Sequence, residues 1–216
     1  DRRGVVGGFS ARGQGHPGAV WQPISGHSRP ASPEEAIPRG RAGRLVGLAD
    51  RLDTLVGFFG LGLVPTGSRD PFGLRRAAQG VVRILLEGEI PLAIQPLLPE
   101  AVALYGDLLP AAAAGRMETL TTFFAERIRH QLALAGHAYD EIEAGLAAGW
   151  ASLPDLRRRV AALQAGREQP GFLAVVLAAK RIANITRGTA AAPLRADRLA
   201  PGVESELGRA SEELAA

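Results

Sequence analysis

The sequence predicts an all-α protein. Apolar residues recur at helical spacing along most of the chain, glycines interrupt that spacing at several points, and no segment shows the pattern of a strand. Hydrophobic residues make up 46% of the 216 residues and charged residues 22%, which is typical of a folded globular chain and not of a disordered one. Aromatic residues are only 5%, so the core must consist mainly of Leu, Val, Ile and Ala.

Composition excludes several kinds of chemistry. The chain has no cysteine, which rules out disulfides, thiolate metal sites and cysteine nucleophiles. No apolar run approaches the roughly 20 residues of a membrane helix, and no signal peptide is seen, so we expect a cytoplasmic protein without a membrane partner. The net charge is +3, and nearly every cation is an arginine because Lys180 is the only lysine. This charge permits a polyanionic partner without requiring one.

The first segment, residues 1–43, is rich in Gly, Pro, Arg and Ser, and loops are expected there. Only residues 18–24 resemble the start of a regular element, and Pro23 interrupts it. Trp21 is expected to anchor this segment in the core. The segment is therefore predicted to be irregular.

Two amphipathic helices follow. Residues 45–59 carry one apolar stripe, and Asp70 with Pro71 is expected to open a second helix that ends at Gly88, with Asp70 as its cap. The first stripe comprises Leu45, Leu48, Ala49, Leu52, Leu55, Val56 and Phe59. The second comprises Leu74, Ala77, Ala78, Val81, Val82 and Leu85.

Five more helices are expected at residues 99–106, 116–136, 140–150, 153–165 and 172–186. The apolar side of the second of these comprises Leu120, Phe124, Ile128 and Leu132. Residues 172–186 are apolar on most sides, as a helix in the middle of a bundle would be. The tail at residues 188–216 is predicted to be loose, with one helix near residues 203–214.

Asp50 and Asp53 are weak candidates for metal ligands, because they lie three residues apart on one helix and hard cations prefer oxygen donors. Salt bridging to nearby arginines is the favoured alternative. His16 and His27 are the only histidines upstream. A metal-dependent phosphohydrolase of the HD type needs an adjacent His-Asp pair, but His27 is followed by Ser28, which disfavours metal-activated hydrolysis.

The polar face of the helix that follows Asp70 forms a basic ridge. Its members, with one loop residue before the helix, are Arg69, Arg75, Arg76, Gln79 and Arg83. Guanidinium groups suit phosphates because they bind two oxygens at once, so the ridge is a candidate contact for an RNA backbone. A solvated face, or pairing with Glu87 and Glu89, explains the same residues equally well.

A second cationic cluster lies on the helix at residues 172–186. It comprises Lys180, Arg181, Asn184 and Arg187, which fall within about a third of the helix circumference. RNA contact is one interpretation, and the preference of helix C-termini for cations is the other. Elsewhere we find neither a glycine-rich phosphate loop nor a Ser-His-Asp arrangement, so the sequence predicts no catalytic residues.

Three stretches resemble the β subunit of bacterial glycyl-tRNA synthetase. The longest, Leu48 to Ile84, reads LADRLDTLVGFFGLGLVPTGSRDPFGLRRAAQGVVRI. The second, Phe123 to Ala148, reads FFAERIRHQLALAGHAYDEIEAGLAA and resembles the start of the helical anticodon-binding domain shared with arginyl-tRNA synthetase. The third, AAKRIANI from Ala178 to Ile185, resembles a central helix of that domain. The resemblance covers roughly Ala31 to Ile185.

The resemblance implies a role in an aminoacyl-tRNA synthetase assembled from two α and two β subunits. In that family the α subunit makes glycyl-adenylate, so ATP and Mg would be bound there and by no residue of this chain. The β subunit supplies tRNA recognition. The implied partners are glycine tRNA, the α subunit and a second β subunit. This chain would be an internal fragment that recognises tRNA.

The resemblance also divides the chain into four segments. In order they are an irregular, poorly matching segment at 1–43, the C-terminal part of a degenerate HD-like helical domain at 44–112, an incomplete anticodon-binding helical domain at 116–190, and a loose tail at 191–216. The chain is expected to stop before the last helices of the family, which should leave an apolar surface exposed around Phe172 to Leu177. Two alternatives stay open, namely an HD-type metal-dependent phosphohydrolase and a structural module at the α–β interface.

Overall fold

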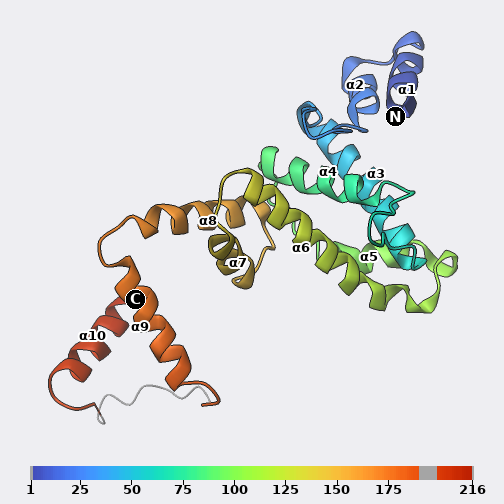
Figure 1. Cartoon of the computed structure of the whole chain (residues 1–216). Helices are drawn as coiled ribbons and strands as arrows, with labels where there is room; N and C mark the ends of the chain where they lie inside the picture. Colours follow the sequence, from blue (N-terminus) through green and yellow to red (C-terminus); the bar gives the residue numbers. More distant parts are fainter. Residues whose placement is uncertain (1, 190–198, 216) are drawn as a thin grey trace. The chain divides into compact units, whose positions relative to one another are not determined.

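The computed structural model describes residues 2–189 and 199–215, and its regular elements are all helices (Figure 1). The predicted all-α class is confirmed. The extended pairing found in the described residues is a single isolated bridge between Thr66 and Arg69. No helix in these residues is long and apolar enough to cross a membrane. The chain divides into two compact units, Asp1–Gln169 and Pro170–Ala216, which we call unit 1 and unit 2.

Unit 1 contains most of the helices. Its α-helices are α1 (Arg2–Gly13), α2 (Gly18–Gly26), α3 (Gly40–Gly60), α4 (Leu74–Glu87), α5 (Leu97–Leu104), α6 (Met117–Leu134), α7 (Tyr139–Ala147) and α8 (Leu153–Arg167). Two short 3₁₀ helices, η1 (Gly106–Leu108) and η2 (Ala111–Arg116), connect α5 to α6. Most predicted helices are therefore found, with ends that differ by a few residues.

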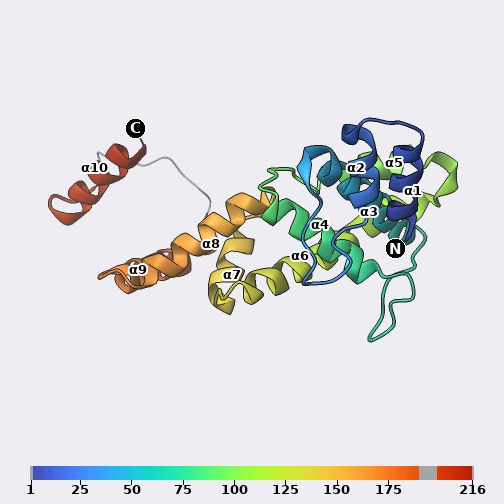
Figure 2. The same ribbon diagram turned by 90° about the horizontal axis from the view of Figure 1, so that it is seen from above.

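The expectation of loops in residues 1–43 is wrong for α1 and α2, which form an antiparallel pair (Figures 1 and 2). The glycines that argued against a helix allow close packing here. A Cβ atom at Gly8 would lie only 2.6 Å from the Cβ atom of Ser25 on α2. Trp21 is half-buried, and the guanidinium of Arg12 lies 5.4 Å from its ring centroid. Trp21 was expected to lie in the core, but it is not part of the main apolar cluster. Tertiary contact has outweighed the poor helix propensity of glycine.

The core of unit 1 lies where α3, α4 and α6 pack against one another, and α5 and η2 contact α3. The predicted stripe of α6 is buried in full, and α3 buries Leu48, Leu55, Val56 and Phe59 of its predicted stripe. Helices α7 and α8 pack on each other and extend the same apolar cluster through Ile142, Leu156 and Val160. This packing holds α4 and α6 side by side.

Helix α4 begins at Leu74, three residues later than a cap at Asp70 with Pro71 in the first turn would place it. Gly73 adopts a left-handed conformation with φ of 67° and separates Pro71 from the helix. The Asp70 carboxylate still accepts hydrogen bonds from the backbone N–H groups of Leu74 (2.8 Å) and Arg75 (2.9 Å). The Asp70 side chain therefore accepts hydrogen bonds from the free N–H groups at the start of α4, as a cap would. It does so across the intervening residues 71–73, which were not predicted to separate it from the helix. Gly88 ends the helix as predicted.

Unit 2 contains α9 (Phe172–Ile185) and α10 (Val203–Ala215). Helix α10 corresponds to the helix expected near residues 203–214. No residue of α9 is buried, so the expected position in the middle of a bundle is not found in the described residues. The expected exposed apolar surface is confirmed. It includes Leu173, Val175, Val176 and Leu177. The part of the predicted loose tail at residues 190–198 lies outside the described residues.

Candidate functional site

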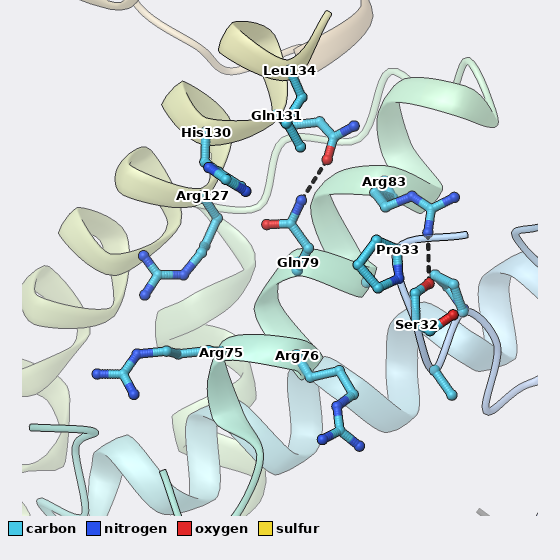
Figure 3. A pocket seen from close by; sticks show the side chains of 13 residues that line it. Ser32, Pro33, Arg75, Arg76, Gln79, Arg83, Arg127, His130, Gln131 and Leu134 are labelled. Carbon is cyan, nitrogen blue, oxygen red and sulfur yellow. Dashed lines mark hydrogen bonds between the residues drawn. The ribbon is translucent and has the colours of Figure 1, made fainter. Parts of the chain in front are cut away.

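The polar face of α4 borders a cavity of about 560 Å³ in unit 1 (Figure 3). Helix α4 forms one wall, α6 forms another, and the loop that contains Pro30 and Pro33 crosses beside α4. The cavity is lined by Pro30, Ala31, Ser32, Pro33, Arg75, Arg76, Gln79, Gly80, Arg83, Arg127, His130, Gln131 and Leu134. Among these described lining residues none is acidic, so the cavity favours an anion.

Arg75 and Arg76 lie at one end of the cavity, where the first turn of α4 begins (Figure 3). Arg76 is exposed, and Arg75 is half-buried with its Nη2 donating to the carbonyl oxygen of Gly67 at 2.5 Å. Arg69 is exposed in the preceding loop and does not line the cavity. Two of the predicted ridge arginines are therefore available to a ligand in the cavity.

Arg83 differs from the other ridge arginines because its residue is only 8% exposed. Its Nε donates to Oε1 of Glu87 at 2.6 Å, and its Nη1 donates to the carbonyl oxygen of Ser32 at 3.1 Å. Pairing with Glu87, one of the two alternatives left open by the sequence, is thus found at Arg83. Glu89 instead pairs with Arg157 of α8. Arg83 mainly ties the Pro30–Pro33 loop to α4.

Helix α6 supplies three polar wall residues that were not predicted from the sequence. These are Arg127, His130 and Gln131. The guanidinium of Arg127 lies 4.2 Å from the centroid of the Phe123 ring, and burial lowers its pKa while Glu126, at 3.0 Å, partly offsets the shift. Gln79 of α4 donates a hydrogen bond to Gln131, so an amide pair spans the two helices (Figure 3).

Arg51 of α3 forms hydrogen bonds to the backbone that leads into the Pro30–Pro33 loop. The residue is only 6% exposed, and its guanidinium donates to the carbonyl oxygens of His27 (2.7 Å), Ser28 (2.7 Å) and Arg29 (2.6 Å). Burial lowers its pKa, although nearby carboxylates oppose that shift. A Cβ atom at Gly80 would lie 2.4 Å from Arg51 Nε, so glycine leaves the space that this side chain occupies. Arg51 therefore fixes the loop that closes the cavity.

The weak metal candidates are not brought together. Asp53 accepts a hydrogen bond from the hydroxyl of Tyr105 on α5 at 2.8 Å, while Asp50 is exposed one turn away. His27 contacts the carbonyl oxygen of Ile24 through Nδ1 at 2.7 Å, and His16 is exposed between α1 and α2. Within residues 2–189 and 199–215, no cluster of three or more His, Asp or Glu side chains that could hold a metal is found. Asp53 has a structural contact instead.

The Tyr105–Asp53 contact predicts a pH dependence. Burial, followed by the hydrogen bond to Asp53, raises the pKa of Tyr105 to about 12 from an ordinary value of about 10. The folded protein thus holds this proton more tightly, and the contact stabilises the fold below about pH 10 and is lost as the pH rises through about 12. Urea unfolding of Tyr105→Phe should show a shallower loss of stability between about pH 10 and 12 than the parent chain. Tyr139→Phe, at a residue 76% exposed, is the matched control, and equal profiles for the two variants would contradict the assignment.

The second cationic cluster belongs to unit 2. Lys180, Arg181 and Asn184 are exposed on α9, and Arg187 Nη2 donates to Oδ1 of Asn184 at 3.0 Å. Lys180, Arg181 and Asn184 lie on α9, whose other residues are mostly apolar, and Arg187 follows the end of that helix. The geometry is compatible with a second anion-binding surface.

Comparison with known proteins identifies a family. The family model described as "Glycyl-tRNA synthetase beta subunit" matches residues 1–147. The match therefore begins at the first residue, which corrects the expectation that residues 1–43 match the family poorly. Proteins named glycine–tRNA ligase beta subunit are similar as well. That of Leptothrix cholodnii is 39% identical over 211 residues, which are 96% of this chain and 29% of the relative.

Two further relatives carry the same name. The protein of Acidobacterium capsulatum is 42% identical over 207 residues, or 95% of this chain and 29% of the relative. The protein of Magnetococcus marinus is 40% identical over 186 residues, or 85% of this chain and 27% of the relative. The chain thus spans less than a third of the length of these relatives.

Proposed function

This chain belongs to the glycyl-tRNA synthetase β subunit family, and from that premise we propose that it is a tRNA-recognition part of a glycine–tRNA ligase. One observation carries the proposal. Arg75, Arg76, Arg127 and His130 all line one cavity, and its described lining residues include no carboxylate. RNA is a polyanion, and such a surface is what an RNA backbone requires.

The proposal assigns the parts of the cavity different tasks. Arg75 and Arg76 contact phosphates directly, because an exposed or half-buried guanidinium has donors free for phosphate oxygens. Arg83 shapes the site through its contacts with Glu87 and Ser32. Arg69 extends the basic surface outside the cavity. Lys180, Arg181 and Asn184 of unit 2 are a second proposed contact with the RNA.

The whole enzyme would divide its work between subunits. We propose that a partner α subunit binds ATP and Mg and forms the glycyl-adenylate, that the β chain presents glycine tRNA to it, and that two copies of each subunit assemble. Within this chain, residues 44–112 would belong to an HD-like domain and residues 116–190 to an anticodon-binding domain. The cavity lies between elements from both of these segments. The interface role is the competing proposal, and copurification of the α subunit with the Arg75→Ala/Arg76→Ala variant would separate it from RNA binding.

The double variant Arg75→Ala/Arg76→Ala should bind glycine tRNA about 10- to 100-fold more weakly than the parent chain at low salt, because two charged contacts with phosphates are lost. A plot of log affinity against log salt should also become shallower by about 1.5, since each lost phosphate contact removes roughly 0.7 to 0.9 from the slope. Filter binding with the full chain over rising salt measures both quantities.

A matched control keeps the change in net charge constant. Arg41 and Arg158 are exposed arginines on α3 and α8 that do not line the cavity, so Arg41→Ala/Arg158→Ala removes the same charge elsewhere. This control should lose only a small, nonspecific part of the affinity. If the two double variants behaved alike, the cavity would not be the RNA contact.

A further inference from the structure

The volume of the cavity exceeds what contact with an RNA backbone requires. Phosphates are met by side chains on a surface, whereas about 560 Å³ between α4, α6 and the Pro30–Pro33 loop is the size of a small-molecule pocket. The volume therefore calls for a ligand group bulkier than a phosphate. That group must be compatible with the cationic end of the cavity at Arg75 and Arg76.

The walls of the cavity offer hydrogen bonds of both kinds. The Gln79–Gln131 pair uses an amide hydrogen of Gln79 and the carbonyl oxygen of Gln131. Gln79 keeps a free carbonyl acceptor, and Gln131 keeps its amide donors. A donor and an acceptor on adjacent amides match the edge of a nucleobase, which also presents donors and acceptors in one plane.

Planar groups also line the cavity. His130 is exposed and presents its imidazole ring at the cavity wall (Figure 3), while the guanidinium of Arg127, another lining residue, packs over the Phe123 ring. Unstacked RNA bases stack on histidine rings and on arginine planes. Pro33 and Leu134 add apolar surface to the same cavity. The wall thus resembles a surface for one base more than a surface for a sugar-phosphate chain alone.

The cavity is also held open before any ligand arrives. Arg83 ties Ser32 to α4, and Arg51 fixes the backbone at residues 27–29 behind it. The α6 wall rests on a stripe of fully buried residues. A preformed site loses less conformational entropy on binding, which favours a specific ligand.

We propose that this cavity binds one unstacked nucleotide of a single-stranded RNA segment. Its base enters between His130 and the Gln79–Gln131 pair, and the adjoining phosphates contact Arg75 and Arg76. This inference rests on the proposed function, namely that the cavity binds RNA. It adds the structural class of RNA that the cavity recognises. Nucleotides in loops and at ends fit this description, and nucleotides within a duplex do not.

Three RNA probes of equal length test the proposal with the full chain. They are a single strand of mixed sequence, the same strand in a blunt duplex, and a ribose-phosphate strand without bases. The single strand should bind about fivefold or more tightly than the strand without bases, because one stacked base adds that much affinity. It should also bind more tightly than the duplex.

Two variants locate this preference. Gln79→Leu/Gln131→Leu, which keeps the side chains similar in size, and His130→Ala, at an exposed residue, should each reduce the advantage of the single strand over the baseless strand. Neither should change the salt dependence, because no phosphate contact is removed. Gln164→Leu on the exposed face of α8 is the control and should keep the full preference.

The outcomes separate the two proposals. Suppose the single strand and the baseless strand bind equally while Arg75→Ala/Arg76→Ala binds more weakly. That result would overturn the proposal that the cavity binds a base, but it would leave the proposed RNA contact in place. Equal or tighter binding of the duplex would overturn the pocket in the same way. A preference for bases that survives in both the glutamine variant and His130→Ala would place the base outside this cavity. If Arg75→Ala/Arg76→Ala bound RNA as tightly as the parent chain, the proposed function itself would be overturned.

Discussion

Replacing Arg51 with methionine should lower the free energy of unfolding by about 2–4 kcal/mol. The buried guanidinium supplies hydrogen bonds to three consecutive carbonyl groups at residues 27–29, and methionine fills similar space without any donor. Carbonyls left without partners carry a desolvation cost, although release of the charged group from burial offsets part of it. Urea unfolding followed by tryptophan fluorescence measures the change, because Trp21 and Trp150 both lie in unit 1.

Arg41→Met is the matched control for this prediction. Arg41 lies on the same helix but is exposed, so the control should change the free energy of unfolding by no more than about 0.5 kcal/mol. Arg51→Met should also weaken tRNA binding under conditions where the variant is still folded, because the cavity loop loses its support. A stability equal to that of the control would show that the loop is held mainly by other contacts.

Truncating Phe124 to alanine should cost about 3–5 kcal/mol in the free energy of unfolding. The side chain is fully buried on α6, where that helix packs against α3 and α4. Removal of the ring leaves a void that the surrounding helices can fill only in part. Since domains of this size are stable by roughly 5–15 kcal/mol, the variant should unfold at clearly lower urea concentration.

Phe9→Ala provides the comparison, because it is the same substitution at a residue that is 71% exposed on α1. Its effect should stay within about 0.5 kcal/mol. If Phe124→Ala is too unstable to purify, Phe124→Leu should give a smaller loss in the same direction. Similar losses at Phe9 and Phe124 would mean that α6 does not carry the core as described.

The sequence was sufficient to predict the helices that carry a complete apolar stripe. The stripe of α6, from Leu120 to Leu132, is buried as expected because helical periodicity alone decides which face meets the core. The same reasoning found α3 and the end of α4 at Gly88. It failed for α1, where glycines serve close packing against α2. Intrinsic propensity cannot show a contact that exists only after two helices meet.

The candidate site was predicted on one side only. The ridge of α4 was visible because Arg75, Arg76 and Gln79 share a helix face, but periodicity says nothing about which second helix lies opposite. Arg127, His130 and Gln131 follow the same spacing on α6 and became relevant only when packing placed them across from Gln79. Arg83 shows the reverse case, since an arginine predicted on the polar face of α4 is buried against a carbonyl group of a loop distant in sequence.

The reliance on arginine in this cavity has a consequence for release. Guanidinium groups keep their protons at every pH at which proteins fold, so the charge contributed by Arg75, Arg76, Arg83 and Arg127 is permanent. A mild change of acidity would leave that part of the attraction intact. A bound polyanion would leave when competing ions displace it, or when α4 and α6 move apart and break the amide pair between them. The residence time of a ligand would thus depend on ionic strength and on the separation of the two helices.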